Sequence, residues 1–151
     1  MPPLLNLVNE AAYRAHFERT CCRASIVTHD GIRVYFRKED FGHAFFESSG
    51  RRGEKDLFSI TRAERMDWIA AALADPAAIC YQGWNSKSRS YSPTRRVTVV
   101  VQDFVIVIAL GLRRDGTIKA SFLTCYQADN SIAKIQSSPL WTLQDFKNVV
   151  R

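Results

Sequence analysis

The chain has 151 residues, of which 46% are hydrophobic and 24% are charged, a composition that fits one globular domain and excludes an extended disordered chain. Lys and Arg number 21 against 15 Asp and Glu, and the net charge of +6 favours a polyanionic partner, although a merely soluble basic protein would look the same. No run approaches the roughly 18 apolar residues of a membrane helix and the first residues lack the basic start of a secretory signal, so we expect a cytoplasmic protein without a membrane partner.

The first 39 residues predict a helix followed by a β-hairpin. Apolar residues recur at mostly helical spacing over residues 4–19. In the segment ASIVTHDGIRVYF, two β-branched stretches flank Asp30 and Gly31, a dipeptide that suits a type I′ turn. Residues 1–39 could be an appendage to a domain of residues 40–151, and we expect the two parts to form one compact unit.

Two helices are predicted next, with a basic loop between them. The segment DFGHAFFESS predicts a short helix with His43 and Glu47 on one face, and the polar loop GRRGEK follows it. Thr61 as N-cap and Glu64 three residues later form a capping box, which predicts that a second helix begins there. Asp75 and Pro76 end this helix.

The remaining sequence predicts a run of strands. They cover residues 77–84, 95–101, 103–112 and 117–127, and a short helix over 129–137 and an irregular or helical tail follow them. Helices first and strands later indicate an α+β fold, with N-terminal helices packed on one face of a twisted antiparallel sheet of about four strands. Such a sheet leaves its second face free for a ligand.

The segment GWNSKSRSYSPTRR, residues 83–96, is the densest functional signal. It combines cations with aromatic residues and contains no acidic residue. Cations neutralise phosphates and aromatic rings stack on bases, so this composition is typical of a groove for single-stranded nucleic acid. A flexible, solvated loop between strands is the alternative. The candidate RNA-binding side chains, including three from the earlier basic loop, are Arg51, Arg52, Lys55, Trp84, Lys87, Arg89, Tyr91 and Arg95.

His43 is the candidate proton carrier. An imidazole titrates near neutral pH, which suits cleavage of RNA by its own 2′-hydroxyl. A partly buried histidine that serves only as a helix residue is the alternative. Arg62 and Arg65, near the start of a helix, could hold a phosphate or could instead pair with Glu64 or Asp67.

Two hydroxyl residues share one face of the last predicted strand. Thr124 and Tyr126 could donate hydrogen bonds to a pentavalent phosphorane, although a strand with alternating polar residues would look the same. The sequence has no P-loop, no dinucleotide glycine pattern, no GxSxG elbow and no paired-acid metal motif.

The cysteine pattern indicates reduced thiols of an intracellular protein. None of the four has the paired spacing of a zinc site. A looser set of His16, Cys21, Cys22 and His29 has the right ligand types but matches no recurrent spacing. We therefore expect neither a metal nor another cofactor.

Three stretches of the chain resemble a known family. They are DFGHAFFESSGRRGEKDLFSITRAERMDWIAAALADP, YQGWNSKSRSYSPTRRVTVVVQDFVIVI and FLTCYQADNSIAKIQSSPLW, and together they cover about two thirds of the chain. They are similar to the phage-associated branch of the barnase, EndoU, colicin and RelE-like superfamily of RNases, the BECR-fold nucleases. The resemblance implies N-terminal helices against a central antiparallel sheet, and metal-independent cleavage of RNA, often tRNA, by toxins and mobile-element proteins.

The resemblance also implies roles for particular residues: a histidine near the first core helix, basic residues flanking the scissile phosphate, and a hydroxyl residue on a late strand. The residues at these positions are His43; Arg62 or Arg65; Arg95 or Arg96; and Thr124, with Tyr126 beside it. They predict a toxin-type endoribonuclease of a phage or mobile element that leaves a 2′,3′-cyclic phosphate and has an acidic immunity or antitoxin protein as a second partner. The alternatives are a non-catalytic nucleic-acid-binding or phage-structural module, and a basic face that docks an acidic protein.

Overall fold

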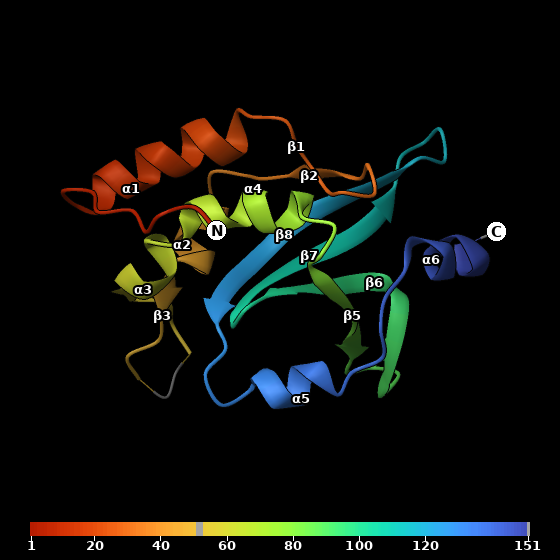
Figure 1. Ribbon diagram of the computed structural model, residues 1–151. Helices are drawn as coiled ribbons and strands as arrows, with labels where there is room; N and C mark the ends of the chain where they lie inside the picture. The colour runs from red at the N-terminus through yellow and green to blue at the C-terminus, as the bar shows by residue number, and fades with distance from the viewer. Residues whose placement is uncertain (51–52, 151) are drawn as a thin grey trace.

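The computed structural model describes residues 1–50 and 53–150, which form helices on both sides of a six-stranded sheet (Figure 1). The strand order in this sheet is β1-β2-β8-β7-β6-β5, and β3 and β4 form a separate pair. The strands are β1 (Ile26–Val27), β2 (Arg33–Tyr35), β3 (Phe46–Glu47), β4 (Leu57–Phe58), β5 (Ile79–Asn85), β6 (Ser90–Val101), β7 (Phe104–Leu112) and β8 (Ile118–Gln127). The helices are α1 (Glu10–Phe17), the π-helix η1 (Glu18–Cys22), α2 (Asp40–Ala44), α3 (Ile60–Ala63), α4 (Met66–Ala74), α5 (Ile132–Gln136) and α6 (Leu143–Val150).

Strands β5 to β8 form an antiparallel meander, as their alternating sequences predict. A two-residue turn joins β6 to β7, and Gln102 adopts a φ of 57° there. The predicted hairpin at the N-terminus is also confirmed, because β1 pairs with β2. Its turn is not the predicted type I′, since Gly31 has a φ of 85° but Asp30 does not have a positive φ.

The sheet differs from the prediction in size and in direction. It has six strands instead of about four, and β2 runs parallel to β8, so that Val34 lies opposite Ala120. The sequence pattern of β1 and β2 predicts only a local hairpin, because two- and three-residue strands carry no signal of the distant strand that they join.

One large core lies between the sheet and the helices α1, α2 and α4. Phe17 of α1 packs against Phe122 of β8, with ring centroids 6.3 Å apart, and Phe36 stacks on Phe122 at 4.8 Å. Residues 1–39 therefore contribute to the same core as residues 40–151. Trp68 donates to the carbonyl of Pro2 at 2.7 Å, which holds the N-terminal segment against the helices.

The sequence predicted N-terminal helices on one face of the sheet and one short helix over residues 129–137. The later helix is present as α5, but the helices pack on both faces of the sheet. Helix α5 follows the last strand, and its Ile132 and Ile135 pack on the opposite face of the sheet, against Tyr81 and Val105. Helix α6 follows α5 along the chain and buries Phe146 in the large core.

Three predicted helices differ from the structure. The helix predicted over residues 40–49 ends at Ala44, so Glu47 lies on β3 and not on one helical face with His43.

The other two differ at their boundaries. The first helix begins at Glu10 instead of residue 4, with Asn9 as its N-cap. The helix predicted to begin at Thr61 is divided into α3 and α4. The N-cap of α3 is Ser59, whose hydroxyl accepts from the Arg62 amide at 3.3 Å. Serine and threonine are both common N-cap residues, so the sequence alone does not choose between Ser59 and Thr61. The paired strands β3 and β4 place Ser59 at the start of the helix.

Candidate nucleic-acid interface

The segment 83–96 forms the distal part of the β5–β6 hairpin instead of a loop. Trp84 lies directly opposite Tyr91, with the ring centroids 5.1 Å apart at 76°. This edge-to-face pair stabilises the two strands. The Trp84 side chain nevertheless remains 54% exposed and that of Tyr91 37% exposed, so both rings are accessible to a stacking partner.

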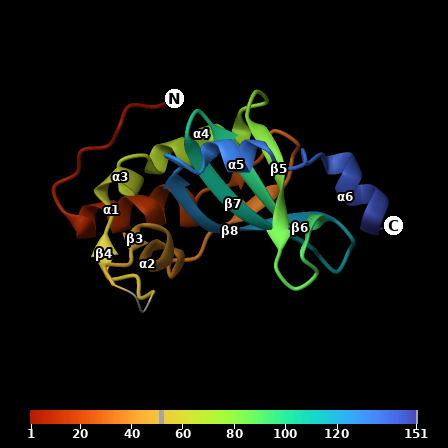
Figure 2. The ribbon, with the colours of Figure 1, turned by 90° about the horizontal axis from the view of Figure 1, so that it is seen from below.

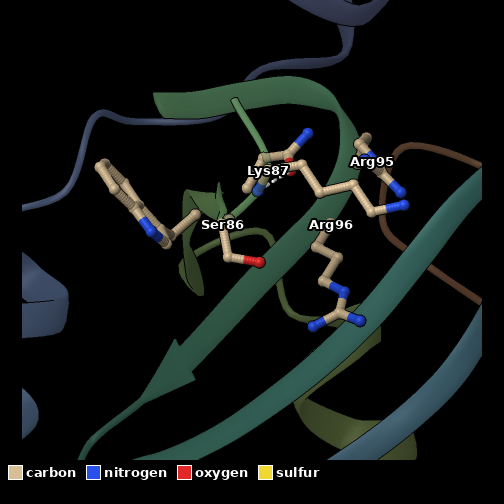
Figure 3. Close-up of a pocket in the computed structure, with 7 residues that line it drawn as sticks. Ser86, Lys87, Arg95 and Arg96 are labelled. Atoms are coloured by element: carbon tan, nitrogen blue, oxygen red, sulfur yellow. Dashed lines mark hydrogen bonds between the residues drawn. The ribbon is translucent and has the colours of Figure 1, made fainter. Parts of the chain in front are cut away.

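A pocket of about 230 Å³ opens beside this pair; we name it the hairpin pocket. It is lined by Gly83, Trp84, Asn85, Ser86, Lys87, Arg95 and Arg96. Figure 3 shows Lys87, Arg95 and Arg96 around the same hollow. Three cations and an exposed indole without an acidic lining residue make the pocket suited to a phosphate and an adjacent base.

Gly83 determines where Arg96 lies. The register between β5 and β6 shifts after Gln82, so that Gly83 pairs with Ser92 while Gln82 pairs with Val97. A Cβ on Gly83 would lie 2.6 Å from the Arg96 Cβ, which no real side chain tolerates. Gly83 therefore allows the two backbones to approach, and this brings Arg96 to the rim of the hairpin pocket.

Arg96 also belongs to a row of residues that crosses the sheet. Its register partner is Ala109 on β7, which pairs with Ser121 on β8, which in turn pairs with Tyr35 on β2. Because register partners point to the same face, the hairpin pocket continues into this face of the sheet.

We name this surface the open face. It carries Arg33, Tyr35, Arg96, Thr98, Ala109, Lys119, Ser121 and Thr124. Seen from below, α5 crosses only one end of the sheet, and α1, α3 and α4 lie on the other side (Figure 2). The six strands contain four cations, Arg33, Arg95, Arg96 and Lys119, and no Asp or Glu. A surface of this charge attracts a phosphate backbone.

Two threonine hydroxyls form the next row of the open face. Thr98 and Thr124 both pair with Val107, from β6 and from β8 respectively. Tyr126 continues the same face of β8 and is half-buried beside α5. Burial raises the pKa of the Tyr126 phenol, and the positive charge of Arg62 opposes this shift, so Tyr126 is a neutral donor at pH 7.

His43 and Arg62 lie beside β8, on helices that pack along this strand beyond the short β2. The His43 side chain is exposed on α2. Arg62 on α3 donates to the carbonyl of Ala44 at 3.1 Å and lies 3.6 Å from Glu47. The structure thus gathers the end of α2, Arg62 and Tyr126 along one strand.

Arg65 is separated from these residues by its own contacts. Its guanidinium donates to Glu64 at 2.7 Å and to the Thr61 carbonyl at 2.8 Å, and it lies 5.3 Å from the centre of the Trp68 ring. The pairing with Glu64 is the alternative that the sequence left open. Arg65 acts as a packing residue in this structure.

Two other predicted RNA-binding residues, Arg89 and Lys55, lie outside the hairpin pocket. Arg89 is exposed at the tip of the β5–β6 hairpin, where its φ is 53°. Lys55 is exposed between β3 and β4, away from the hairpin pocket. Arg51 and Arg52 lie outside the described residues.

The sequence did not single out Arg33, Tyr35, Lys119 and Ser121 as functional. Arg33 and Tyr35 alternate along β2, and Lys119 and Ser121 alternate along β8. This alternation predicts polar faces of two separate strands, whereas the parallel pairing that unites them is not visible in the sequence.

No family model matches this chain, and no curated protein or solved structure is significantly similar to it. Within residues 1–50 and 53–150, no helix is both long enough and apolar enough to cross a membrane.

Proposed function

We propose that this protein binds single-stranded RNA in the hairpin pocket and on the open face, and cleaves it there as a metal-independent, toxin-type endoribonuclease. The observation that carries the proposal is the position of Arg96. This residue lines the hairpin pocket beside Trp84 and begins the row that crosses the open face to Tyr35. One guanidinium can therefore hold a phosphate between a stacked base and the threonine hydroxyls.

Binding in this proposal divides between bases and phosphates. A base stacks on the exposed Trp84 ring, and its neighbouring phosphates meet Lys87, Arg95 and Arg96. Because these contacts read the backbone and the aromatic face of any base, they favour single strands without selecting one sequence. Transfer RNA, with its unpaired loops, is one candidate substrate.

The proposed reaction is transesterification within the RNA. The ribose 2′-oxygen attacks the adjacent phosphorus and loses its proton to a base, the bond from phosphorus to the 5′-oxygen breaks, and the leaving oxygen takes up a proton. The products are a 2′,3′-cyclic phosphate and a 5′-hydroxyl. We assign one of the proton transfers to His43, the charge of the phosphorane to Arg96, and a hydrogen bond to a phosphorane oxygen to Thr124.

Incubation of the purified protein with total tRNA, in EDTA and at low salt, tests this proposal. The His43→Ala variant is compared with wild type and with His29→Asn, because His29 lies against Asp30, at 2.9 Å, in the β1–β2 turn. We expect discrete fragments with cyclic phosphate ends from wild type and from His29→Asn, and a loss of cleavage in His43→Ala. Equal cleavage rates in all three proteins would remove His43 from the mechanism.

A non-catalytic RNA-binding module is the second candidate. The hairpin pocket favours it, because Trp84, Tyr91 and the three cations all belong to the β5–β6 hairpin. His43 instead lies on α2, which packs along β8, two strands from β6. In that case the RNA stays intact and its mobility shift weakens steeply with salt. An acidic immunity or antitoxin protein fits the same cationic face and would compete with RNA.

A further inference from the structure

A second cluster of cations lies at the opposite edge of the open face, around the exposed ring of Tyr35. Arg113 donates to the Tyr35 hydroxyl at 2.9 Å, and its guanidinium carbon lies 5.6 Å from the ring centre. Arg33 lies over the same ring, at 4.9 Å. The Tyr35 side chain is 41% exposed, so the ring and its two guanidinium groups form part of the surface.

Hydrogen bonds and stacking hold the two arginines in place, and no carboxylate of the described residues lies within ion-pair distance of them. Within the described part of the chain, neither Arg33 nor Arg113 forms an ion pair, and the buried Nε of Arg33 has no acceptor. Arg113 also donates to the Thr117 hydroxyl and to the Ile118 carbonyl, which fixes its position on the β7–β8 turn. Asp115 is the nearby acidic group, and its carboxylate accepts from Thr117.

Lys119 extends this cluster toward the middle of the sheet. It pairs with Arg33 on one side and with Gly111 on the other. A Cβ on Gly111 would meet the Lys119 side chain at 3.7 Å, so the lysine lies over β7. The electrostatic result is visible at Tyr35, where the hydrogen bond from Arg113 and the surrounding positive charge keep the phenol pKa below its ordinary value.

Small side chains separate this cluster from Arg96. In the row that crosses the sheet, the two residues between Arg96 and Tyr35 are Ala109 and Ser121. Three strand spacings separate the ends of the row by about 14 Å. Cationic side chains at the two ends of this row, with small side chains between them, suit a single polyanionic strand that runs across the sheet.

We propose that Arg33, Tyr35, Arg113 and Lys119 form a second phosphate-binding site for the RNA strand whose base lies in the hairpin pocket. This inference rests on the proposed function and extends it, because it gives the N-terminal strand β2 a direct role in substrate binding. It predicts that the RNA must be long enough to reach both the hairpin pocket and the second site before the second site contributes to affinity.

The test uses the full chain and two fluorescent 2′-O-methyl oligouridylates, of about four and about twelve nucleotides, which bind without being cleaved. Fluorescence anisotropy gives the dissociation constant and its dependence on salt. In Arg113→Gln and Lys119→Gln we expect unchanged binding of the short oligomer. For the long oligomer we expect about tenfold weaker binding at low salt, which corresponds to the loss of one charge-assisted hydrogen bond. The slope of the logarithm of the binding constant against the logarithm of the salt concentration should fall by about 0.7 for each lost phosphate contact.

Arg114→Gln is the matched control, because Arg114 is exposed in the same turn and loses the same charge. Lys119→Gln keeps the test informative if Arg113→Gln fails to fold, since Lys119 is exposed and glutamine retains its Cβ and Cγ atoms. Equal losses in Arg113→Gln, Lys119→Gln and Arg114→Gln, or wild-type binding of the long oligomer by the first two, would overturn the second site alone. Failure of wild type to bind either oligomer would overturn the proposed function and the second site with it.

Discussion

Gly83 lies so close to Arg96 that a Cβ on the glycine would be 2.6 Å from the Arg96 Cβ and 3.1 Å from its carbonyl oxygen. This contact joins the strand that carries Trp84 to the strand that carries the central arginine of the interface. It is therefore the point at which the geometry of the hairpin pocket depends on a single missing methyl group.

Gly83→Ala should displace Arg96 and reduce both stability and RNA binding. The clash with the Arg96 Cβ at 2.6 Å requires the strands to separate, which we expect to cost about 1 to 3 kcal/mol of unfolding free energy. Urea unfolding and anisotropy measure the two effects. Gly111→Ala is the control, because a Cβ there meets Lys119 at an ordinary 3.7 Å; equal stability losses in both variants would contradict the close contact.

Trp84→Ala should weaken RNA binding and leave the fold intact. The ring is 54% exposed and packs mainly on Tyr91, whereas a stacked base contributes about 1 to 3 kcal/mol to binding. Competition binding with oligouridylate measures the loss. Leu57→Ala removes another exposed apolar side chain, on β4, and should bind like wild type; a Trp84→Ala protein with wild-type affinity would place the bases elsewhere.

Thr124→Val should slow cleavage without changing the affinity for a non-cleavable RNA. Valine keeps the shape of the side chain and removes the hydroxyl that we assign to the phosphorane, for which a loss of about a hundredfold in rate is typical. Thr98→Val is the matched comparison, since Thr98 lies in the same row two strands away. A larger rate loss in Thr98→Val than in Thr124→Val would transfer this role to β6.

Alkaline pH should destabilise the protein through three thiols, of which Cys21 and Cys125 are buried and Cys80 is half-buried. Burial raises the pKa of Cys21 to about 12 and that of Cys80 to about 11, and it raises the pKa of Cys125 still further. Above pH 9.0, the ordinary pKa of a cysteine thiol, these thiols ionise in the unfolded chain but stay protonated in the folded state. The stabilisation is complete below pH 9 and is lost as the pH rises toward the folded values, by about 1.4 kcal/mol per thiol and pH unit.

Urea titrations at pH 8 and pH 10 measure this loss. Because tyrosine and lysine also titrate in this range, the decisive comparison is Cys80→Ala, which should lose about 1.4 kcal/mol less than wild type between the two pH values. An identical loss in both proteins would mean that the Cys80 thiol ionises equally in the folded and unfolded states.

The local elements of the fold were predictable from the sequence, because each depends on neighbouring residues. The alternation in β7 and β8 and the turn near Asp30 and Gly31 gave their positions correctly, whereas β6 begins at Ser90 instead of the predicted residue 95. The join between β2 and β8 was not predictable, since it depends on the packing of Phe17 and Phe36 against Phe122.

The candidate site was also predictable only where it depends on residues that are neighbours in the sequence. The cations and aromatic residues of 83–96 come together as predicted, because one hairpin holds them. Arg65 does not join these residues as the sequence predicted. Its pairing with Glu64 and its stacking on Trp68 arise at the break between α3 and α4, which the predicted continuous helix did not contain. Tyr35 and Lys119 were missed because only the parallel register places them on one surface.

The parallel pairing of β2 with β8 also has a consequence for the order of folding. It joins a strand from the first quarter of the chain to a strand from the last quarter, and the chain between them must be closed into a loop before the pair can form. During synthesis the ribosome releases β2 long before β8 exists, so the N-terminal hairpin waits without its partner strand. The row from Arg96 to Tyr35 is therefore complete only when β8 has emerged, and a product truncated before β8 would lack it.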